Sequence, residues 1–358
     1  MKSDYMLDGH KLFWHLDRVC EWQKDRLIAP IYLEISPVSY CNHNCVFCGL
    51  DFARKEFLAL DAAILEKRIG EMAELGIRSI MFAGEGEPLL HPGMAEIVRT
   101  TREKGIDASI TTNGMVGNRM IWESILPHLT WIRFSIDAAT SKAYEQVHRV
   151  RPECFDRTLN SLREALATKD RFKLPCTIGV QFLLIEENLN DVEAAIRLYS
   201  DIGVDYLSFK PYSEHPQMLY KSGFTYSEEI ISGIDSLVKQ HQSTAKTTII
   251  FRKVATASYA EGSPRFEHCY SAPFWGYISS KGDYYTCSVY LNDDRFKVGN
   301  IYDSPMESII GGEKRRSSID YAEHELAVGH ECRVNCRMAR INEFLHYVNR
   351  KPEHINFI

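Results

Sequence analysis

The sequence predicts an α/β fold: a partial (βα)6 TIM-like barrel followed by a small C-terminal domain with a β-hairpin and a helix. Three observations lead to this prediction. Up to about residue 213, six segments rich in β-branched and aromatic residues alternate with helical segments, the pattern of buried parallel strands joined by helices. Cysteines, glycines and charged residues gather where these strands end. After Cys269, a hairpin pattern around a Lys-Gly-Asp turn replaces the alternation.

The predicted elements follow one another in a regular order. An amphipathic helix is expected over residues 8–26, before the first strand. The six strands are expected within residues 29–41, 77–88, 107–114, 130–138, 176–185 and 204–213, with helices within 62–76, 93–105, 120–129, 155–170 and 190–203. The resulting parts are an N-terminal helical extension (1–29), the barrel (30–213), a linker with one helix (214–265) and the C-terminal domain with its final helix (266–358).

Composition limits the class of function. The chain has 358 residues, is 45% hydrophobic and carries a formal net charge of -6, as expected of a soluble globular protein of one or two domains. The negative charge argues against nucleic acid as a partner. No apolar run approaches the roughly 18 residues that a membrane span needs. The N-terminal segment lacks the features of a signal peptide, so a cytoplasmic location is expected.

Three cysteines lie within eight residues of the loop that follows the first strand. Cys41, Cys45 and Cys48 have the spacing C-x3-C-x2-C, and Phe47 precedes the third cysteine. Three thiolates can hold three irons of a [4Fe–4S] cube and leave the fourth iron open. On spacing alone, a zinc site completed by a distant histidine remains the alternative.

This loop resembles the signature of the radical SAM enzymes, which follows the first strand of a partial (βα)6 barrel. The turn after the second strand, Gly84 to Pro88, resembles that family's GGEP motif, with Glu85 where a small residue is common. The resemblance implies that S-adenosylmethionine (SAM) binds the open iron. It also implies that one electron from the reduced cluster cleaves SAM to a 5′-deoxyadenosyl radical, and that a donor such as flavodoxin or ferredoxin supplies that electron.

The resemblance further implies a set of residues that contact SAM. The glycines would let the backbone approach its methionine moiety, and Glu87 with nearby carbonyls would accept from its amino group. Ser135 and Arg149 would approach its carboxylate and ribose; alternatively, Ser135 caps a strand and Arg149 is a solvated charge. The residues assigned to SAM are Phe47, Gly84, Glu85, Gly86, Glu87, Asn113, Ser135 and Arg149.

Four more cysteines lie in the C-terminal domain. They are Cys269, Cys287, Cys332 and Cys336, spaced C-x17-C-x44-C-x3-C, which suits a fully ligated second [4Fe–4S] cluster, with zinc as the alternative. The hairpin between the first two and the stretch Gly299-Asn300-Ile301 resemble the auxiliary-cluster domains of the SPASM and twitch subfamilies. Because no cysteine follows Cys336, the resemblance favours the shorter, one-cluster twitch type.

The favoured reaction is oxidation or epimerisation of a small polar metabolite held between the barrel and the C-terminal domain. A sugar, an aminocyclitol or an amino acid would fit, because only some 30 residues precede the barrel and peptide-modifying relatives usually carry an extra leader-binding domain. Lys210 and His215, after the sixth strand, are candidate bases for oxidation. Cys154, at a helix N-terminus, is a candidate hydrogen donor for epimerisation, although a structural role is the commoner one for such a cysteine.

Two other hypotheses stay open. In one, the chain is a peptide-modifying radical SAM enzyme that joins a carbon radical of the substrate to another atom. In a different class, it would be a non-catalytic iron–sulfur scaffold or redox sensor. Formation of 5′-deoxyadenosine from SAM separates an enzyme from a scaffold.

Overall fold

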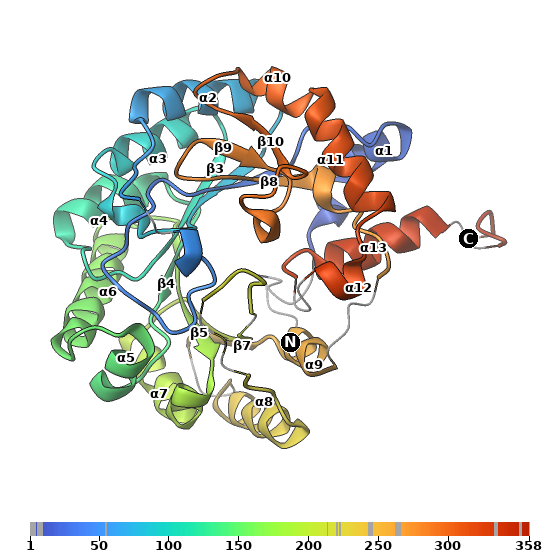
Figure 1. The fold of residues 1–358 in the computed structure, drawn as a ribbon. Helices are drawn as coiled ribbons and strands as arrows, with labels where there is room; N and C mark the ends of the chain where they lie inside the picture. Colours follow the sequence, from blue (N-terminus) through green and yellow to red (C-terminus); the bar gives the residue numbers. More distant parts are fainter. Residues whose placement is uncertain are drawn as a thin grey trace.

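A single curved sheet organises the molecule. The computed structural model describes residues 5, 10–53, 56–212, 214–219, 221, 223–242, 246–261, 266–332, 336–350 and 353–357. Within these residues the strands form one sheet in the order β10-β9-β8-β1-β2-β3-β4-β5-β6-β7 (Figure 1). The sheet curves into an open barrel with helices on its convex side. This arrangement confirms the predicted α/β class with a partial TIM-like barrel.

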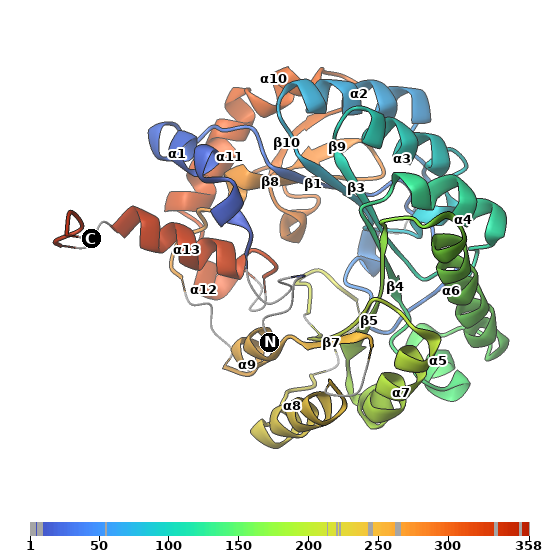
Figure 2. The same cartoon turned by 180° about the vertical axis from the view of Figure 1, so that it is seen from behind.

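The six predicted barrel strands are present and parallel. They are β1 (Tyr32–Ile35), β2 (Ser79–Phe82), β3 (Asp107–Thr112), β4 (Trp131–Ser135), β5 (Thr177–Leu184) and β6 (Tyr206–Pro211). The helices of this region are α1 (Leu16–Lys24), α2 (Ala62–Glu74), α3 (Met94–Glu103), α4 (Arg119–Ile125), α5 (Ser141–His148), α6 (Glu153–Phe172) and α7 (Val192–Ile202). From behind, α2, α3, α4 and α6 are seen along the outside of the strands (Figure 2).

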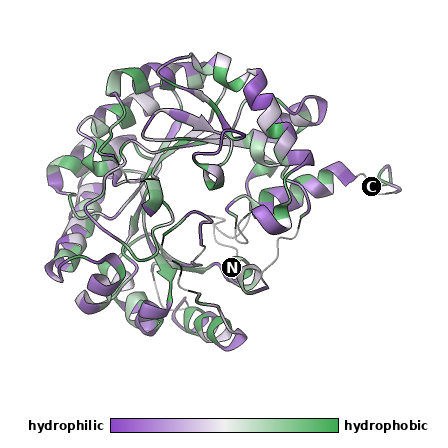
Figure 3. Cartoon of the chain, viewed as in Figure 1, coloured by the Kyte–Doolittle hydropathy of each residue, from purple (hydrophilic) through white to green (hydrophobic). Residues whose placement is uncertain are grey.

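The two faces of the sheet differ because side chains alternate along a strand. On β4, Ile132 and Phe134 belong to the hydrophobic core that the sheet shares with the helices. Arg133 lies between them and points to the concave face, where its guanidinium donates to Thr111 Oγ1 on β3 (3.1 Å). The helices around the sheet carry both hydrophobic and hydrophilic residues along their length (Figure 3). The concave face is therefore polar, which suits a binding site better than a packed core.

The C-terminal domain is joined to the barrel through the same sheet. Strand β8 (Trp275–Ile278) pairs in parallel with β1 over its whole length. The hairpin partner β9 (Asp283–Tyr285) and then β10 (Lys297–Asn300) extend the sheet in antiparallel fashion. Helices α10 (Met306–Ile310), α11 (Glu313–His324), α12 (Val328–Glu331) and α13 (Ala339–Arg350) complete the domain. The hairpin predicted from sequence thus lies directly beside the first barrel strand.

The opposite edge of the sheet holds a strand that the sequence did not reveal. Residues 214–265, expected to be a linker with one helix, contain α8 (Glu228–Gln242), strand β7 (Thr248–Phe251) and α9 (Lys253–Glu261). Strand β7 pairs in parallel with β6. The helix before it was predicted, but the short β-branched run Thr248–Phe251 was not, and its pairing with β6 shows that it is a strand. No helix in the described part of the chain is long and apolar enough to cross a membrane.

Candidate functional site

The loop after β1 brings Cys41, Cys45 and Cys48 to the carboxyl end of the barrel strands. The three side chains are partly buried. Two polar groups of the protein donate toward Cys41 Sγ, the backbone N–H of His43 (3.4 Å) and the amide of Asn113 (3.8 Å). Donors of this kind stabilise the negative charge of a cluster-bound thiolate. The loop therefore fits a [4Fe–4S] cluster held by three cysteines.

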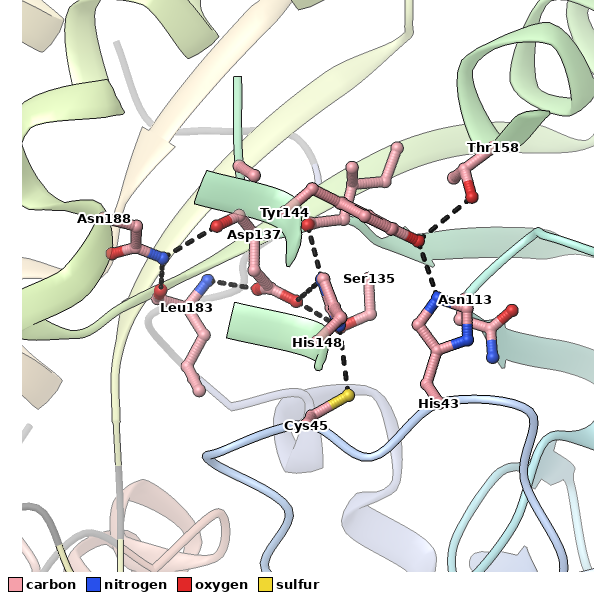
Figure 4. A network of polar contacts seen from close by, with 12 residues as sticks. His43, Cys45, Asn113, Ser135, Asp137, Tyr144, His148, Thr158, Leu183 and Asn188 are labelled. Carbon is pink, nitrogen blue, oxygen red and sulfur yellow. Dashed lines mark hydrogen bonds and ion pairs between the residues drawn. The ribbon is translucent and has the colours of Figure 1, made fainter. Parts of the chain in front are cut away.

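A buried polar network lies under this loop. His148, at the end of α5, contacts Cys45 Sγ through Nδ1 (3.0 Å) and the Ile136 carbonyl through Nε2 (2.6 Å) (Figure 4). A carbonyl only accepts, so Nε2 carries the hydrogen, and Nδ1 accepts from the Cys45 thiol when that sulfur holds no iron. Burial lowers the pKa of His148 to about 3, and the ring is neutral. Phe47 packs edge-on against this ring, with the ring centroids 5.6 Å apart.

Asp137 occupies the centre of the same network. It has a left-handed backbone conformation with φ of +56° and is fully buried. Its carboxylate accepts from the Leu183 amide (2.6 Å) and from Ser135 Oγ (2.9 Å), and lies 3.7 Å from His148 Nε2. Burial raises the pKa of Asp137 to about 7. The predicted SAM residue Ser135 is thus tied to Asp137 at the end of β4.

The glycine-rich turn after β2, residues 84–88, lies against the cysteine loop. Gly84 has φ of +124°, and a Cβ there would lie 2.6 Å from Tyr277 Oη. A Cβ on Gly86 would overlap the carbonyl oxygen of Tyr40. Both glycines are therefore required by close backbone packing. The same packing holds the turn next to the cluster loop, as the predicted role in SAM binding needs.

Glu87 turns its carboxylate toward the end of β3. It accepts from Thr112 Oγ1 (2.5 Å), the Asn113 amide (2.7 Å) and the Leu89 amide (3.1 Å). Burial raises the pKa of Glu87 to about 7. Asn113 continues the chain of contacts, since its side-chain amide donates to Asn42 Oδ1 (2.6 Å) in the cysteine loop. The TTNG segment thus connects the glycine-rich turn with the cluster loop.

Glu85 points in a different direction, toward the C-terminal domain. Its carboxylate accepts from Tyr277 Oη (3.3 Å), from the Ser280 amide (3.3 Å) and from Ser280 Oγ. Burial raises the pKa of Glu85. The sequence assigned this residue to SAM with its neighbours, but the side chain reaches the β8–β9 hairpin instead.

A cavity of about 450 Å³ opens beside Glu85, between the barrel loops and the C-terminal domain. Its lining comes from the segment after the cysteine loop, the glycine-rich turn, the loop after β6 and the β8–β9 region; the residues are Phe52, Ala53, Glu56, Glu85, Gln217, Ser279, Lys281, Asp283, Tyr285, Leu291 and Asn292. At its edge, Lys281 Nζ pairs with Glu56 (3.2 Å). Two sequence-distant parts of the chain therefore share one pocket near the cluster loop.

The four C-terminal cysteines converge on one apolar cavity. Cys269, Cys287, Cys332 and Cys336 all line it, together with aromatic side chains such as Trp275 and Tyr290. Burial raises the pKa of the Cys287 thiol, and the other three cysteines raise it further. The backbone N–H of Met338 donates to Cys336 Sγ (3.4 Å). Four thiols around an apolar space fit a fully ligated [4Fe–4S] cluster.

A [4Fe–4S] cluster and a single metal ion require different arrangements of the cysteine sulfurs. No three His, Cys, Asp or Glu side chains among the described residues are arranged to hold one metal ion. A [4Fe–4S] cube binds each cysteine through a separate iron, so its ligands need not meet at one point.

The remaining four predicted residues lie in different environments. Lys210 lies on β6 beside Leu183 of β5, where its charge offsets part of the rise that burial causes in the pKa of Asp137. Arg149 is exposed at the end of α5, with a left-handed φ of +51°. His215 is buried, contacting Ser288 O through Nε2 (3.1 Å) and the Gln217 amide through Nδ1 (3.2 Å). Cys154 is buried in the hydrophobic core, as the second residue of α6.

His148, Asp137, Tyr277 and Ser280 were missed by the sequence reasoning. His148 directly precedes the predicted SAM residue Arg149, and that position in the chain is its one local signal. Asp137 follows Ser135 in the "SID" end of β4, so its place at a strand end was a signal that was not used. Tyr277 and Ser280 carry no local signal, because their partner Glu85 is about 190 residues away in the chain.

Known protein families match both the barrel and the C-terminal domain. Residues 35–209 match the radical SAM superfamily, and residues 269–337 match SPASM, described as an iron–sulfur cluster-binding domain. Together these domains imply SAM and two [4Fe–4S] clusters as the cofactors.

Among curated proteins, the chain is similar to GTP 3′,8-cyclase of Chlorobaculum tepidum, with 30% identity over 189 residues, 51% of this chain and 55% of that protein. A probable GTP 3′,8-cyclase of Sulfurisphaera tokodaii is 26% identical over 58% of this chain and 63% of its own length. The chain thus spans between half and two thirds of these relatives.

Solved structures resemble this chain over a larger share of its length than the curated relatives do. SuiB of Streptococcus suis bound to SAM has a TM-score of 0.68 and 18% identity, covering 95% of this chain and 79% of that chain. The complex of SuiB with the precursor peptide SuiA has a TM-score of 0.65 and 19% identity over 84% of this chain and 69% of that one. The enzyme anSMEcpe with bound SAM and a peptide has a TM-score of 0.59 and 18% identity, with 88% coverage of both chains.

These findings correct the expected reaction. Oxidation or epimerisation of a sugar, aminocyclitol or amino acid is wrong, since the similar proteins are named as GTP cyclases or are described with bound peptides. The structure gives physical reasons for the error. The proposed thiol donor Cys154 is packed in the core behind the sheet, and both ring nitrogens of the proposed base His215 contact protein groups.

The barrel, the three-cysteine loop and the four-cysteine cavity agree with both family matches. The chain belongs to the radical SAM superfamily and carries a SPASM-type iron–sulfur cluster-binding domain after its barrel.

Proposed function

We propose that this radical SAM enzyme modifies a peptide whose reactive side chain enters the cavity between the barrel and the C-terminal domain. The cavity of about 450 Å³ carries the proposal, because both domains line it and it adjoins the glycine-rich turn. A space of this size accepts one or two side chains and a short length of backbone. The solved structures that resemble both domains of this chain include two described with bound peptides.

The proposal assigns separate tasks to the residues of the chain. Cys41, Cys45 and Cys48 hold the cluster that binds SAM, and the four C-terminal cysteines hold the second cluster. When bound, the first cluster and SAM supply a carbon-centred radical that takes hydrogen from the substrate. Gly84 and Gly86 admit the methionine moiety of SAM, and Glu87 with backbone carbonyls accepts from its amino group. Phe47, Asn113, Ser135 and Arg149 complete the assigned SAM contacts.

The charges of the cavity favour a peptide over a nucleotide. Three acidic residues, Glu56, Glu85 and Asp283, line the cavity together with Lys281. Glu56 pairs with Lys281, and Asp283 pairs with Lys297 Nζ (2.9 Å), so the cations near the cavity already have carboxylate partners. A nucleoside triphosphate carries several negative charges and needs cations that are available to bind it. A neutral or basic peptide side chain makes no such demand. The names of the curated relatives nevertheless make GTP the natural competing substrate, and the experiment includes it.

The test is substrate-stimulated cleavage of SAM under anaerobic conditions. Reconstituted full-length chain is reduced and incubated with SAM alone, with GTP, or with pools of short synthetic peptides, each pool rich in acidic, basic, aromatic or hydroxyl side chains. The proposal expects at least one peptide pool to raise 5′-deoxyadenosine above the SAM-only level and to yield a peptide of altered mass. Consumption of GTP with no response to any peptide pool would overturn it. The variant with Cys41, Cys45 and Cys48 all changed to Ala serves as the inactive control.

A further inference from the structure

The turn of residues 84–88 is held between two distant parts of the chain. On one side the cysteine loop contacts it, since the Glu87 amide donates to the Tyr40 carbonyl (3.0 Å). The Glu85 amide donates to Ser36 Oγ (3.0 Å), just after β1. On the other side lies the β8–β9 hairpin. The position of this turn is therefore set jointly by the barrel and the C-terminal domain.

Glu85 makes the side-chain contact with the hairpin. Its carboxylate, 4% exposed, accepts two hydrogen bonds from Ser280 and one from Tyr277 Oη. Tyr277 is itself fully buried on β8. A buried carboxylate that loses its donors costs free energy, so the turn and the hairpin hold each other in place.

The contact depends on the length of the side chain at position 85. A small residue there would not reach Ser280. Gly84 supports the same contact, because Tyr277 Oη lies 2.6 Å from the position that a Cβ on Gly84 would take. The hairpin thus packs directly on the turn, and Glu85 adds hydrogen bonds to that packing.

We propose that Glu85 is a positioning residue that fixes the SAM-binding turn through its hydrogen bonds to Ser280 and Tyr277 of the C-terminal domain. SAM affinity then depends on a hairpin that belongs to the other domain. The proposal rests on the assignment of SAM to residues 84–88 under the proposed function, and not on the identity of the substrate.

The test measures SAM affinity by calorimetry on the reconstituted full-length chain without substrate. Glu85→Ala removes the three hydrogen bonds and should weaken SAM binding about ten-fold. Glu85→Gln should stay near the wild type, because its amide oxygen still accepts and its amide nitrogen can donate to Ser280 Oγ. Ser280→Ala, a change in the hairpin alone, should weaken SAM binding about three-fold.

A matched control separates positioning from general loss of stability. Glu323→Gln alters another buried glutamate, on α11, which pairs with Arg26 after α1 (3.1 Å) and makes no contact with Glu85. It should lower the melting temperature while leaving SAM affinity unchanged. A Glu85→Ala protein that binds SAM as tightly as the wild type overturns the proposal. If Glu85→Ala does not fold, wild-type SAM affinity in Ser280→Ala overturns it instead.

Glu87→Gln tests the SAM assignment separately. Weaker SAM binding in this variant supports the assignment of SAM to the turn. If it binds SAM more weakly while Glu85→Ala and Ser280→Ala do not, the positioning role of Glu85 alone is overturned. If neither Glu87→Gln nor Glu85→Ala changes SAM affinity, the assignment of SAM to this turn is overturned together with the role of Glu85.

Discussion

The two cysteine sites of this chain differ in their number of ligands and in their lining. At the three-cysteine loop, the His43 N–H and the Asn113 amide donate toward Cys41 Sγ. The four-cysteine cavity is lined mainly by apolar and aromatic side chains, although the Met338 N–H donates toward Cys336 Sγ and the Asn342 amide toward Cys269 Sγ. Three thiolates leave one iron of a [4Fe–4S] cube open for a cofactor, whereas four leave none. The number of ligands therefore favours SAM binding at the first site and another task for the second.

The strongest test of this contrast removes the first site. Changing Cys41, Cys45 and Cys48 together to Ala should halve the iron, from about eight to about four atoms per chain, and should abolish 5′-deoxyadenosine formation. The physical reason is that only this cluster offers an open iron. Iron analysis and chromatography of the nucleoside product measure the two effects. Continued cleavage of SAM by this variant would mean that the two sites have been assigned in the wrong order.

The reverse change should give a different result. Changing Cys269 and Cys287 to Ala should also remove about four irons, because the second cube loses two of its four ligands. The remaining cluster should still bind SAM, seen as a change in its electron paramagnetic resonance spectrum on SAM addition. Full iron content, or zinc bound at this site in the wild-type chain, would contradict the second cluster.

A single methyl group should disturb the first site strongly. In Gly86→Ala the new Cβ would overlap the Tyr40 carbonyl oxygen, so the turn must move away from the cysteine loop. SAM affinity should fall by an order of magnitude or more, measured by calorimetry. Gly233→Ala is the matched control, since no atom lies within 4 Å of its Cβ position in helix α8. That variant should gain up to about 1 kcal/mol of stability from helix propensity.

The polar site should also show a dependence on pH. Burial raises the pKa of Glu87 to about 7 from an ordinary value of 4.5, so the folded chain without SAM binds this proton more tightly than the unfolded chain. The stability associated with the protonated carboxyl is present below pH 4.5 and is lost as the pH rises to about 7, by up to ~3 kcal/mol. Urea unfolding of the wild type and Glu87→Gln at several pH values measures it. The free energy of unfolding of the wild type should fall relative to that of Glu87→Gln as the pH rises from about 4.5 to about 7. A difference between the two proteins that stays constant with pH would contradict the raised pKa of Glu87.

Much of this site was predictable from local sequence. The spacing of Cys41, Cys45 and Cys48, the glycines at 84 and 86 and the hairpin after Cys269 all depend on residues close together in the chain. The alternation of strands and helices also fixed where the strand ends lie, and thus which loops meet. The predicted residues Asn113 and Glu87 are in fact joined by a hydrogen bond of 2.7 Å.

The directions of individual side chains were not predictable in the same way. Cys154 was expected near the site because it begins a helix, yet the face of α6 that it occupies packs into the core. His215 was expected as a base, yet its ring contacts the Ser288 carbonyl in the C-terminal domain. Each of these outcomes depends on packing between elements, and no periodic pattern in a single element records it.

The sequence by itself predicted the family, the six parallel strands of the barrel and two groups of candidate cysteine ligands, because spacing and periodicity are properties of neighbouring residues. Only the tertiary structure placed β8 beside β1 and turned Glu85 toward Ser280, almost two hundred residues later in the chain. Such contacts form when a whole sheet closes. Their cause lies in long-range packing of buried surfaces and in the need of a buried carboxylate for hydrogen-bond donors, and not in any local motif.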